Sequence, residues 1–569
     1  MLSNTLPERL EQAAAQATKD RGLIFVDGKK DDQLVTWQKI AQLSRQAAHV
    51  LQSIGLQKHD RVAIVLPTCL DFFEVFFGSQ YLGAVPTPLY PPLRFGKMDE
   101  YISKTIAMLK AAQIDMIITN KRIGKVFGQI MQGYSPKYGL HYVENLKSDK
   151  EYSQIHVLTD DLAMAQFSSG TTVSPKPVGL THRQVLANAD IILQYIPVEI
   201  GCSWLPLYHD MGLVGCIFTT VSCMGTMVLI PPEKFLAKPV IWLQKIAQYK
   251  CYISPAPNFA YAYCTQRILD ADLTGVDLSC WKMALNGAEA VSPQSLRDFN
   301  QRFAPYGLLA EALTPVYGMA EASLAVSFSD PNQLFTTTIF ERESLLSGKA
   351  QKSSSSLSSI ELASVGKALP GFEIEIRKDQ IVLDEGNVGS IFIKGPSIMK
   401  GYLNQDSTAA SPLKDGWLDT GDVGFFFDSE LYIYGRQKDI IIKGGQNHAP
   451  QDIEQALDDL EHVRRGCSVA VGDITENGEA IYVFVESSFA QGHLIEQCKR
   501  HILSKTGIEC DLIVLLAPGT IPRTSSGKLR RQETLKQFQQ GTLIPPQKVN
   551  AFNMAGVLAK SMLGYWRSR

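Results

Sequence analysis

Residues 166–182 have the composition of a loop that holds phosphate. The stretch reads QFSSGTTVSPKPVGLTH, with several hydroxyl side chains around a glycine and one lysine further on. Hydroxyl groups and consecutive backbone N–H groups can surround phosphate oxygens. The residues that would do so are Ser168, Ser169, Gly170, Thr171, Thr172 and Lys176.

The loop does not follow the common nucleotide-binding patterns. A Walker loop needs GxxxxGK followed by Ser or Thr, but Pro175 stands at the second glycine position and Pro177 follows Lys176. The stretch also lacks a GxGxxG dinucleotide motif. Clusters of Ser, Thr, Gly and Pro are by themselves typical of plain surface turns. Phosphate binding therefore depends on the motifs that accompany the loop.

Seven further motifs follow the loop in order along the chain. They read SWLPLYHDMGL, NGAEAVSP, VYGMAEA, GSIFIKGPSIMKGY, WLDTGD, GRQKDIIIKGGQNHAPQDIE and PRTSSGKLRR. Together with the loop they resemble the adenylate-forming superfamily, which includes acyl-CoA synthetases, peptide-synthetase adenylation domains and luciferases. The resemblance covers almost the whole chain. It implies that a carboxylate attacks the α-phosphate of ATP, giving an acyl-adenylate and pyrophosphate.

The resemblance assigns two residues to the chemistry. Two anions meet in this reaction, so a cation near both must neutralise the charge that develops, and Lys528 in TSSGKL resembles the superfamily's lysine for that role. Glu321 in YGMAEA resembles the Mg²⁺ ligand, since one carboxylate plus phosphate oxygens is a usual magnesium arrangement. The alternatives are a solvated loop lysine and a glutamate at a helix start.

The nucleotide pocket follows from the same motifs. Tyr317 should stack on adenine, Asp422 should accept the ribose hydroxyls, and Arg436 should reach the ribose with Ile433 beneath it. A core aromatic, a turn aspartate and a structural salt bridge are the alternatives for Tyr317, Asp422 and Arg436. The remaining residues expected along the nucleotide are Gly287, Ala288, Glu289, Gly318, Met319 and Ala320.

Three positions depart from the superfamily's pattern. Val173 and Pro177 stand where glycines are usual, and Pro177 has no N–H to donate. Ala320 stands where threonine is frequent, so one hydroxyl contact to phosphate is missing. The two changes in the loop, Val173 and Pro177, predict a stiffer loop in a protein that is still active, because Ser169, Gly170, Thr171, Thr172 and Lys176 are present.

The fatty acyl-AMP ligase branch fits these motifs better than the amino-acid-activating branch. Amino-acid-activating domains carry FDxS where this chain has YHDMG, so Asp210 lies in a different frame. A fatty chain needs an apolar tunnel, and His209, Asp210, Met211 and Phe259 are the candidates to contact the acid. Met211 and Phe259 could equally be core residues.

That branch also carries an insertion after the YGMAEA-type motif, and residues 336–362 fit it in place and character. In acyl-CoA synthetases the C-terminal domain swings about a hinge after adenylation, and Lys438 occupies the hinge position. An insertion that packs on the C-terminal domain would favour the adenylating form. Deletion of residues 336–362 should then change the use of CoA.

The acyl acceptor is expected to be a separate phosphopantetheinylated acyl carrier protein, because the tail after Arg531 is too short for a carrier domain. Two other functions stay open. The chain could be a fatty acyl-CoA synthetase, which formation of a CoA thioester would decide. It could also be a catalytically silent nucleotide- or lipid-binding relative, although Lys528, Glu321 and Asp422 argue against this.

The elements that must position these residues alternate between short apolar runs and helical patterns. Residues 60–67 and 114–120 predict buried strands, and residues 69–84 predict an amphipathic helix. This alternation predicts an α/β fold with parallel, helix-covered sheets. Residues 372–395 alternate with period two, which favours an antiparallel, barrel-like region. We expect an adenylation domain over residues 1–434 and a mobile α+β domain over 435–569.

Composition excludes several classes of protein. The chain of 569 residues has a net charge of −2, which does not indicate a nucleic-acid surface. Ten cysteines without a CxxC pair favour reduced thiols over a metal or disulfide framework. No basic-then-apolar signal begins the chain, so a cytoplasmic protein is expected. Residues 213–230 are uncharged, but their Gly, Ser and Thr content predicts a buried helix and strand rather than a membrane span.

Overall fold

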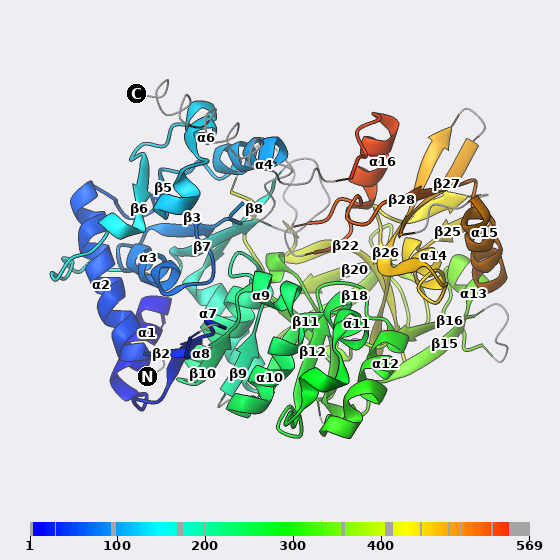
Figure 1. Cartoon of the computed structure of the whole chain (residues 1–569), viewed down its shortest axis with the longest axis horizontal. Helices are drawn as coiled ribbons and strands as arrows, with labels where there is room; N and C mark the ends of the chain where they lie inside the picture. Colours follow the sequence, from blue (N-terminus) through cyan, green and yellow to red (C-terminus); the bar gives the residue numbers. More distant parts are fainter. Residues whose placement is uncertain are drawn as a thin grey trace.

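The computed structural model describes most of the chain and places its sheets side by side (Figure 1). The described residues are 4–28, 30–92, 98–167, 175–196, 200–331, 333–353, 359–403, 413–443, 446–475, 478–488, 492–524, 527–545 and 561. The predicted phosphate loop, residues 168–172, and Val173 lie outside this set, as does most of the serine-rich patch near residue 355.

A four-stranded parallel sheet lies in the N-terminal part of the chain. The predicted strands at 60–67 and 114–120 are confirmed, and their apolar residues are buried because helices cover the sheet. The sheet order is β4 (Val85–Pro88), β3 (Arg61–Val65), β5 (Met116–Thr119) and β6 (Leu140–Tyr142). The helices of this part are α1 (Leu6–Gln16), α2 (Trp37–Ile54), α3 (Leu70–Tyr81), α4 (Met98–Ala111), α5 (Lys121–Gly124) and α6 (Gly128–Gly133).

The helix predicted at 69–84 is present as α3, but the expectation of an amphipathic helix is wrong. Every residue from Phe72 to Tyr81 is buried. Helix α2 packs closely against α3, and strands β3 and β4 contact it as well. With packing partners on several sides, an apolar residue is favourable at almost every position, and no solvent-facing stripe is needed.

A nine-stranded sheet forms the centre of the molecule. Six neighbouring strands run parallel, while antiparallel strands close both edges. Its order is β17 (Lys367–Ala368), β14 (Ala325–Phe328), β13 (Leu313–Gly318), β12 (Met283–Gly287), β11 (Ile253–Pro257), β9 (Ile200–Ser203), β10 (Thr226–Leu229), β1 (Gly22–Phe25) and β2 (Gln33–Thr36). Its helices include α7 (His182–Leu193), α9 (Pro232–Ala237), α10 (Val240–Tyr249), α11 (Asn258–Arg267) and α12 (Pro293–Phe303).

Residues 213–230 form a buried helix and strand, as predicted. A π-helix, η3 (Met211–Phe218), continues into α8 (Thr219–Ser222) and is followed by β10 of the central sheet. Within the part of the chain that the structure describes, no helix is long and apolar enough to cross a membrane. The uncharged composition of the segment therefore reflects burial in the central core.

An antiparallel sheet follows the central sheet, in agreement with the period-two pattern of residues 372–395. Its strands are β18 (Glu373–Lys378), β19 (Ile381–Val382), β20 (Gly389–Lys394), β21 (Leu413–Lys414), β22 (Trp417–Phe427) and β23 (Glu430–Arg436). The segment predicted as an insertion forms a hairpin of β15 (Thr337–Glu341) and β16 (Ser359–Ala363), with the short helix α13 (Arg342–Leu346) after β15.

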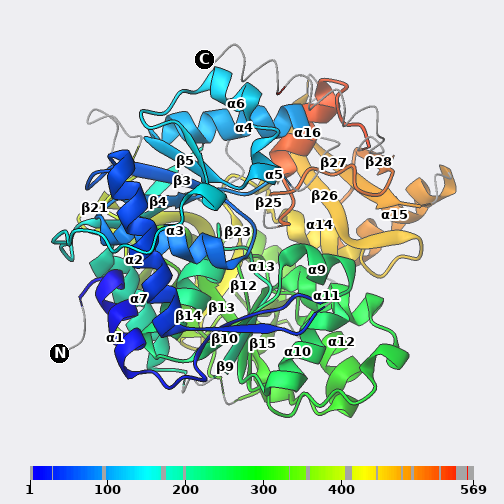
Figure 2. The ribbon, with the colours of Figure 1, turned by 60° about the vertical axis from the view of Figure 1, so that its left-hand side comes forward.

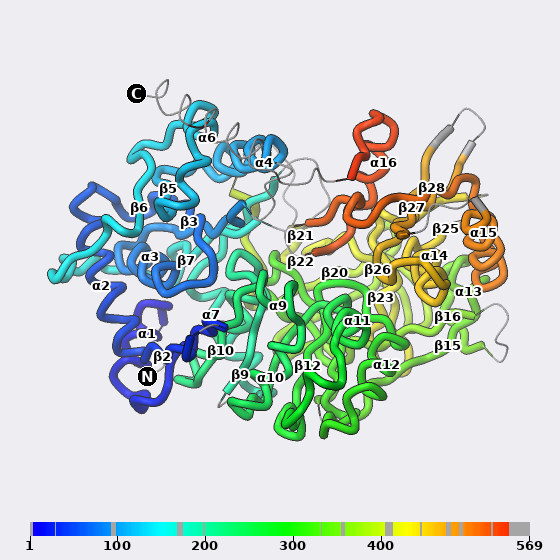
Figure 3. The backbone as a smooth tube through the Cα atoms, viewed as in Figure 1, coloured from blue at the N-terminus to red at the C-terminus, as the bar shows by residue number. Residues whose placement is uncertain are grey.

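The C-terminal part builds its own three-stranded sheet and a separate apolar core. Figure 3 shows most of this part, coloured from yellow to red, on the opposite side of the molecule from α1 and α2, and Figure 2 shows its last helix, α16 (Arg531–Gln539), beside α4. The three strands of this sheet are β26 (Val463–Thr475), β27 (Gly478–Ser487) and β28 (Leu512–Leu516). The C-terminal part also contains β24 (Ile441–Lys443) and β25 (Gln446–His448), which pair with each other. Its helices are α14 (Pro450–Ala456), α15 (Gly492–Thr506) and α16 (Arg531–Gln539).

Candidate active site

Fifteen of the residues singled out in the sequence line one cavity of about 370 Å³. They are His209, Asp210, Met211, Phe259, Ala288, Glu289, Tyr317, Gly318, Met319, Ala320, Glu321, Asp422, Ile433, Arg436 and Lys528. Gly287, Lys176 and Lys438 do not line it, and Lys438 is exposed just after β23. The cavity thus brings together strand ends of the central sheet, the antiparallel sheet and the C-terminal part.

Asp422 is held by two donors from different elements. The Tyr317 hydroxyl donates to Oδ2 at 2.7 Å and the Arg436 Nε donates to Oδ1 at 2.9 Å. Arg436 lies opposite Asp422 because β22 and β23 pair in antiparallel register. The Asp422 charge raises the pKa of Arg436, so the guanidinium stays charged. A carboxylate presented this way can accept hydroxyl groups of a sugar.

Glu321 lies in the tight turn that follows β13. Residues Ala320–Ala322 form a single 3₁₀ turn, and Ser323 has a φ of 69°, in the left-handed region. The carboxyl group is buried, which raises its pKa, and its Oε1 accepts a hydrogen bond of 3.0 Å from the Tyr402 hydroxyl. Among the described residues, no cluster of three acidic, His or Cys side chains could form an all-protein metal cage.

One buried carboxylate suits Mg²⁺, which is commonly bound by one or two carboxylates together with substrate phosphates. The donor set at Glu321 therefore fits a metal that arrives with a nucleotide better than one held by protein alone.

Lys528 extends into the cavity from the C-terminal part. Its backbone closes a turn with Thr524, through Thr524 N–H to Lys528 O at 2.8 Å and Lys528 N–H to Thr524 Oγ1 at 3.0 Å. Burial lowers the pKa of Lys528, and the charge of Arg436 adds to this, while the carboxylates of Asp210 and Glu289 oppose it. An ammonium placed between carboxylates in a cavity is suited to neutralise an incoming anion.

Asp210 connects the two ends of the cavity. It accepts a 2.8 Å hydrogen bond from the Met211 N–H at the start of η3, and His209 Nδ1 lies 2.5 Å from its Oδ1. Burial acts to raise the pKa of Asp210, but His209, Lys528 and the Met211 N–H together lower it. Asp210 is therefore an anion whose charge acts on Lys528, and its carboxylate accepts a hydrogen bond from the first turn of η3.

The backbone at Ala288 is strained where β12 ends. Its φ of 68° is in the left-handed region, which side-chain-bearing residues rarely adopt. Such outliers cluster at functional sites. The next residue, Glu289, accepts a 2.6 Å hydrogen bond from the Phe259 N–H, so the turn is fixed to the start of α11.

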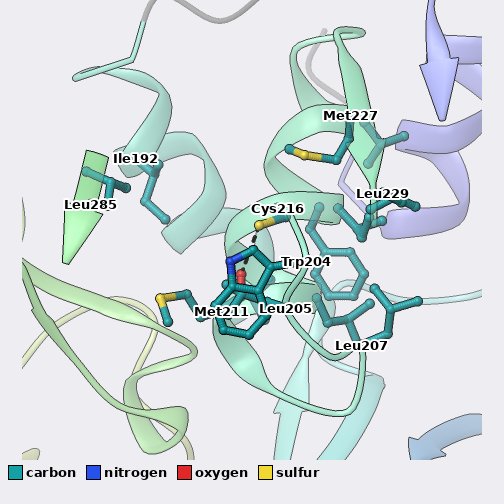
Figure 4. Close-up of a cluster of buried hydrophobic side chains, with 14 of the residues drawn as sticks. Ile192, Trp204, Leu205, Leu207, Met211, Cys216, Met227, Leu229 and Leu285 are labelled. Carbon is teal, nitrogen blue, oxygen red and sulfur yellow. Dashed lines mark hydrogen bonds between the residues drawn. The ribbon is translucent and has the colours of Figure 1, made fainter. Parts of the chain in front are cut away.

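The other end of the cavity is apolar. Of the apolar residues that line it, the sequence analysis identifies only Met211 and Phe259. Figure 4 shows Met211 and Met227 extending toward Ile192 and Leu285, which also line it. These residues come from η3, β10, α7 and β12, so no local pattern could have identified them. The remaining apolar lining includes Ile196, Gly215, Cys216, Ile253, Leu324 and Phe328.

The polar side chains at this end are turned toward the helix backbone. Thr219 Oγ1 donates to Val214 O at 3.1 Å, and Cys216 Sγ donates to Met211 O at 3.2 Å. Thr220 Oγ1 donates to Cys216 O at 2.5 Å. Because these donors are satisfied within the helix, the cavity is lined mainly by methyl, methylene and sulfur groups, which favours an alkyl chain.

The hairpin of β15 and β16 packs between the antiparallel sheet and the C-terminal part. Phe340 is fully buried and meets Phe425 at 5.0 Å between ring centroids. Arg342 forms a buried ion pair with Asp452 of α14. Burial raises the pKa of Asp452 to about 6 although Arg342 opposes this shift. The hairpin therefore contacts the C-terminal part directly.

Comparison with known proteins identifies the family. The AMP-binding enzyme family matches residues 10–403, and the AMP domain of Disco-interacting protein 2-like proteins matches residues 438–547. A Caulobacter vibrioides protein, provisionally named an acyl-CoA synthetase, is 33% identical over 87% of this chain and 88% of its own length. Long-chain-fatty-acid–AMP ligase FadD26 of Mycobacterium bovis is 30% identical over 94% of this chain and 97% of its own.

A solved structure from work on fatty acyl-adenylate ligases of E. coli and L. pneumophila has the same fold. It superposes with a TM-score of 0.87 at 33% identity and covers 94% of this chain and 98% of its own. The α/β architecture predicted from the sequence is thereby confirmed, and so is the adenylating chemistry that the motifs indicated. The chain belongs to the AMP-binding enzyme family, as an ATP-dependent adenylating enzyme.

Proposed function

We propose that this chain is a fatty acyl-AMP ligase. It joins a medium- or long-chain fatty acid to AMP and passes the acyl group to a separate phosphopantetheinylated acyl carrier protein rather than to CoA. The observation that carries the proposal is that one cavity contains both kinds of surface. Lys528 and Asp422 line one end, and the apolar surface of η3, whose polar side chains are hydrogen-bonded to its own backbone, lines the other. The relatives named as fatty-acid ligases support it.

The reaction places the carboxylate oxygen on the α-phosphorus while the bond to the bridging oxygen breaks and pyrophosphate leaves. Asp422 and Arg436 hold the ribose, Tyr317 flanks the adenine, and Lys528 neutralises charge on the phosphate and the carboxylate. Mg²⁺ bound to Glu321 and to phosphate oxygens would supply further charge neutralisation. The predicted loop at 168–172 and Lys176 would hold the leaving phosphates.

The choice of acceptor would depend on the position of the C-terminal part. The Arg342–Asp452 ion pair links the inserted hairpin to α14, a short distance after the predicted hinge at Lys438. A contact of this kind would favour the adenylating arrangement over a rotated one that admits CoA. A buried pair suits the purpose because removal of one partner leaves an uncompensated charge, which costs about 3–5 kcal/mol.

The test uses the purified chain with ATP, Mg²⁺ and dodecanoic acid, divided between CoA and a phosphopantetheinylated carrier protein. Mass spectrometry should find acyl-AMP that persists with CoA and acylated carrier in the other half. Acyl-CoA would instead indicate a synthetase, the function suggested by the name of the Caulobacter relative. Absence of adenylate with any acid would indicate a binding-only protein.

Point variants separate the role of the hairpin from its stability. Deletion of residues 336–362 would remove Phe340 from a buried cluster, so Arg342→Met is the better change. It should allow acyl-CoA to form. Arg297→Met is the matched control, because the hydrogen-bond partners of the Arg297 guanidinium are Glu361 of the same hairpin, at 2.6 Å, and Gln294 of α12. Unchanged acceptor use by Arg342→Met would contradict the proposed role.

A further inference from the structure

We propose that Tyr402 is a positioning residue that fixes Glu321 and Lys176 in one arrangement and thereby sets how the enzyme takes up metal-bound ATP. The inference rests on the proposed function only in assuming that Mg·ATP is the nucleotide bound. Tyr402 follows the antiparallel sheet's strand β20 in the sequence and ends the motif GSIFIKGPSIMKGY.

One side chain makes both contacts. The Tyr402 hydroxyl donates to Glu321 Oε1 at 3.0 Å, and the Lys176 Nζ lies 4.9 Å from the centroid of the Tyr402 ring. An ammonium at this distance from an aromatic face is attracted by the ring. The ring and the hydroxyl of Tyr402 therefore connect the end of the predicted phosphate loop with the predicted metal ligand.

The backbone around Tyr402 is fixed to the same two regions. Tyr402 forms an antiparallel bridge with Val178, and the Leu403 N–H donates to Pro177 O at 2.9 Å, both in strand β8 (Pro177–Thr181). The Met399 N–H donates to Glu321 O at 2.8 Å. The segment thus spans from the carbonyl of Glu321 to the strand that follows the loop.

Helix α7 also fixes the segment before Tyr402, through hydrogen bonds from its side chains. Gln184 Nε2 donates to Ile398 O at 2.5 Å, and Asn188 Nδ2 donates to Ser397 Oγ at 3.0 Å. The buried Asn188 amide also donates to Ala325 O at 2.9 Å, in the strand after the Glu321 turn. Because the backbone on both sides of Tyr402 is fixed by these hydrogen bonds, the Tyr402 side chain has little freedom to move away from Glu321.

The chemical consequence concerns orientation. With Oε1 accepting from Tyr402, the second oxygen of Glu321 has a defined direction, and hydrogen bonds to a ligating carboxylate tune its affinity for metal. The ring of Tyr402 meanwhile supports Lys176 where the leaving phosphates are expected. Loss of the hydroxyl should therefore affect the metal, and loss of the ring should also affect the phosphates.

Calorimetric titration of ATP without any acid, with and without Mg²⁺, measures these effects apart from turnover. For Tyr402→Phe, the Mg²⁺ concentration needed for half-maximal tightening of ATP binding should rise about tenfold, within the range for lost second-layer partners. The affinity for metal-free ATP should not change. For Tyr402→Leu, metal-free ATP should also bind several-fold more weakly, because Lys176 loses its support.

Tyr134→Phe is the matched control, since its hydroxyl donates to Ile114 O at 2.7 Å in the N-terminal part, outside the cavity lining. It should titrate like the original chain. The same Mg²⁺ dependence for Tyr402→Phe and the original chain would overturn the inference. An equal loss of affinity for metal-free and for metal-bound ATP in Tyr402→Phe would also overturn it, because it would indicate a structural effect only.

Fatty acid activation is assayed separately in the original chain. A chain that fails to adenylate fatty acids but shows the Mg²⁺ shift in Tyr402→Phe would overturn the proposed function and leave the role of Tyr402 standing. Because Tyr402→Phe keeps the ring, the inference can be tested even if Tyr402→Leu does not fold.

Discussion

The two ends of the cavity are built in different ways. At the polar end, charged groups come from the central sheet, the antiparallel sheet and the C-terminal part, and each is held by a few hydrogen bonds such as those on Asp422. At the apolar end, η3, α7 and β10 belong to one continuous core. The first depends on how separate parts are placed, and the second on how one core is packed.

This difference predicts how variants should behave. A change at the polar end should lower the rate of adenylation while leaving the core and its stability nearly intact. A change at the apolar end should alter which acid is accepted, because the shape of the space is altered rather than the charges. The following experiments test this distinction, beginning with the largest expected effect.

Lys528→Ala should have the largest effect. Loss of a group that stabilises charge in the transition state costs about 100- to 1,000-fold in rate. Fatty-acid-dependent exchange of pyrophosphate into ATP measures the adenylation step, and the melting temperature should change little because Lys528 lies in a turn beside the cavity. A fall of less than threefold would show that Lys528 does not act on the reacting groups.

Gly215→Leu should lower the maximum chain length of the fatty acid that the enzyme accepts. An added Cβ would meet Leu324 Cδ2 at 2.6 Å, and Gly215 lines the apolar end, so a larger side chain must extend into the space for the alkyl chain. Each excluded methylene costs about 0.8 kcal/mol, so three would reduce kcat/KM for dodecanoate by about 50-fold.

Shorter acids should lose much less than dodecanoate in this variant. Competition among acids of different length, resolved by mass, gives the profile. A uniform loss for all lengths would place Gly215 outside the path of the chain.

The pH dependence of kcat/KM should reflect the environment of Lys528. Its pKa is lowered from the usual 10.5, mainly by burial, so the ammonium loses its proton and its charge at lower pH than an exposed lysine does. Activity should therefore be present below that lowered pKa and be lost as the pH rises through it. Lys528→Arg, although slower, should keep a flat profile to higher pH. An identical alkaline limb in both proteins would assign the limb to another group.

Glu100→Gln should have the smallest effect. Glu100 in α4 lies 3.8 Å from the Arg530 guanidinium, close to Lys528 in the sequence, and Glu100 is about one-third exposed. Partly exposed pairs of this kind contribute about 0–1 kcal/mol, so kcat/KM should change by less than about fivefold. A loss of kcat/KM comparable to that of Lys528→Ala would show that the Glu100–Arg530 contact, rather than buried packing, positions Lys528 in the cavity.

Much of this architecture was predictable from short patterns. The strands at 60–67 and 114–120 were recognisable because apolar runs of that length are buried wherever they fall in a parallel sheet. Helix α3 was located correctly, but its burial on all sides depended on α2, which no local pattern could show. The domain limits at 434 and 435, the hinge at Lys438 and the individual roles of the site residues stay predictions.

By itself the sequence determined the chemistry, because the reacting groups lie in short motifs, as with Glu321 in YGMAEA and Lys528 in TSSGKL, whose residue types limit what they can bind. Tertiary structure alone decided which groups meet. Tyr402 reaches Glu321 across 81 positions, and Arg342 reaches Asp452 across 110. The cavity likewise joins η3 to the C-terminal part. Such contacts arise from the packing of whole sheets and helices, which no local spacing of residues encodes.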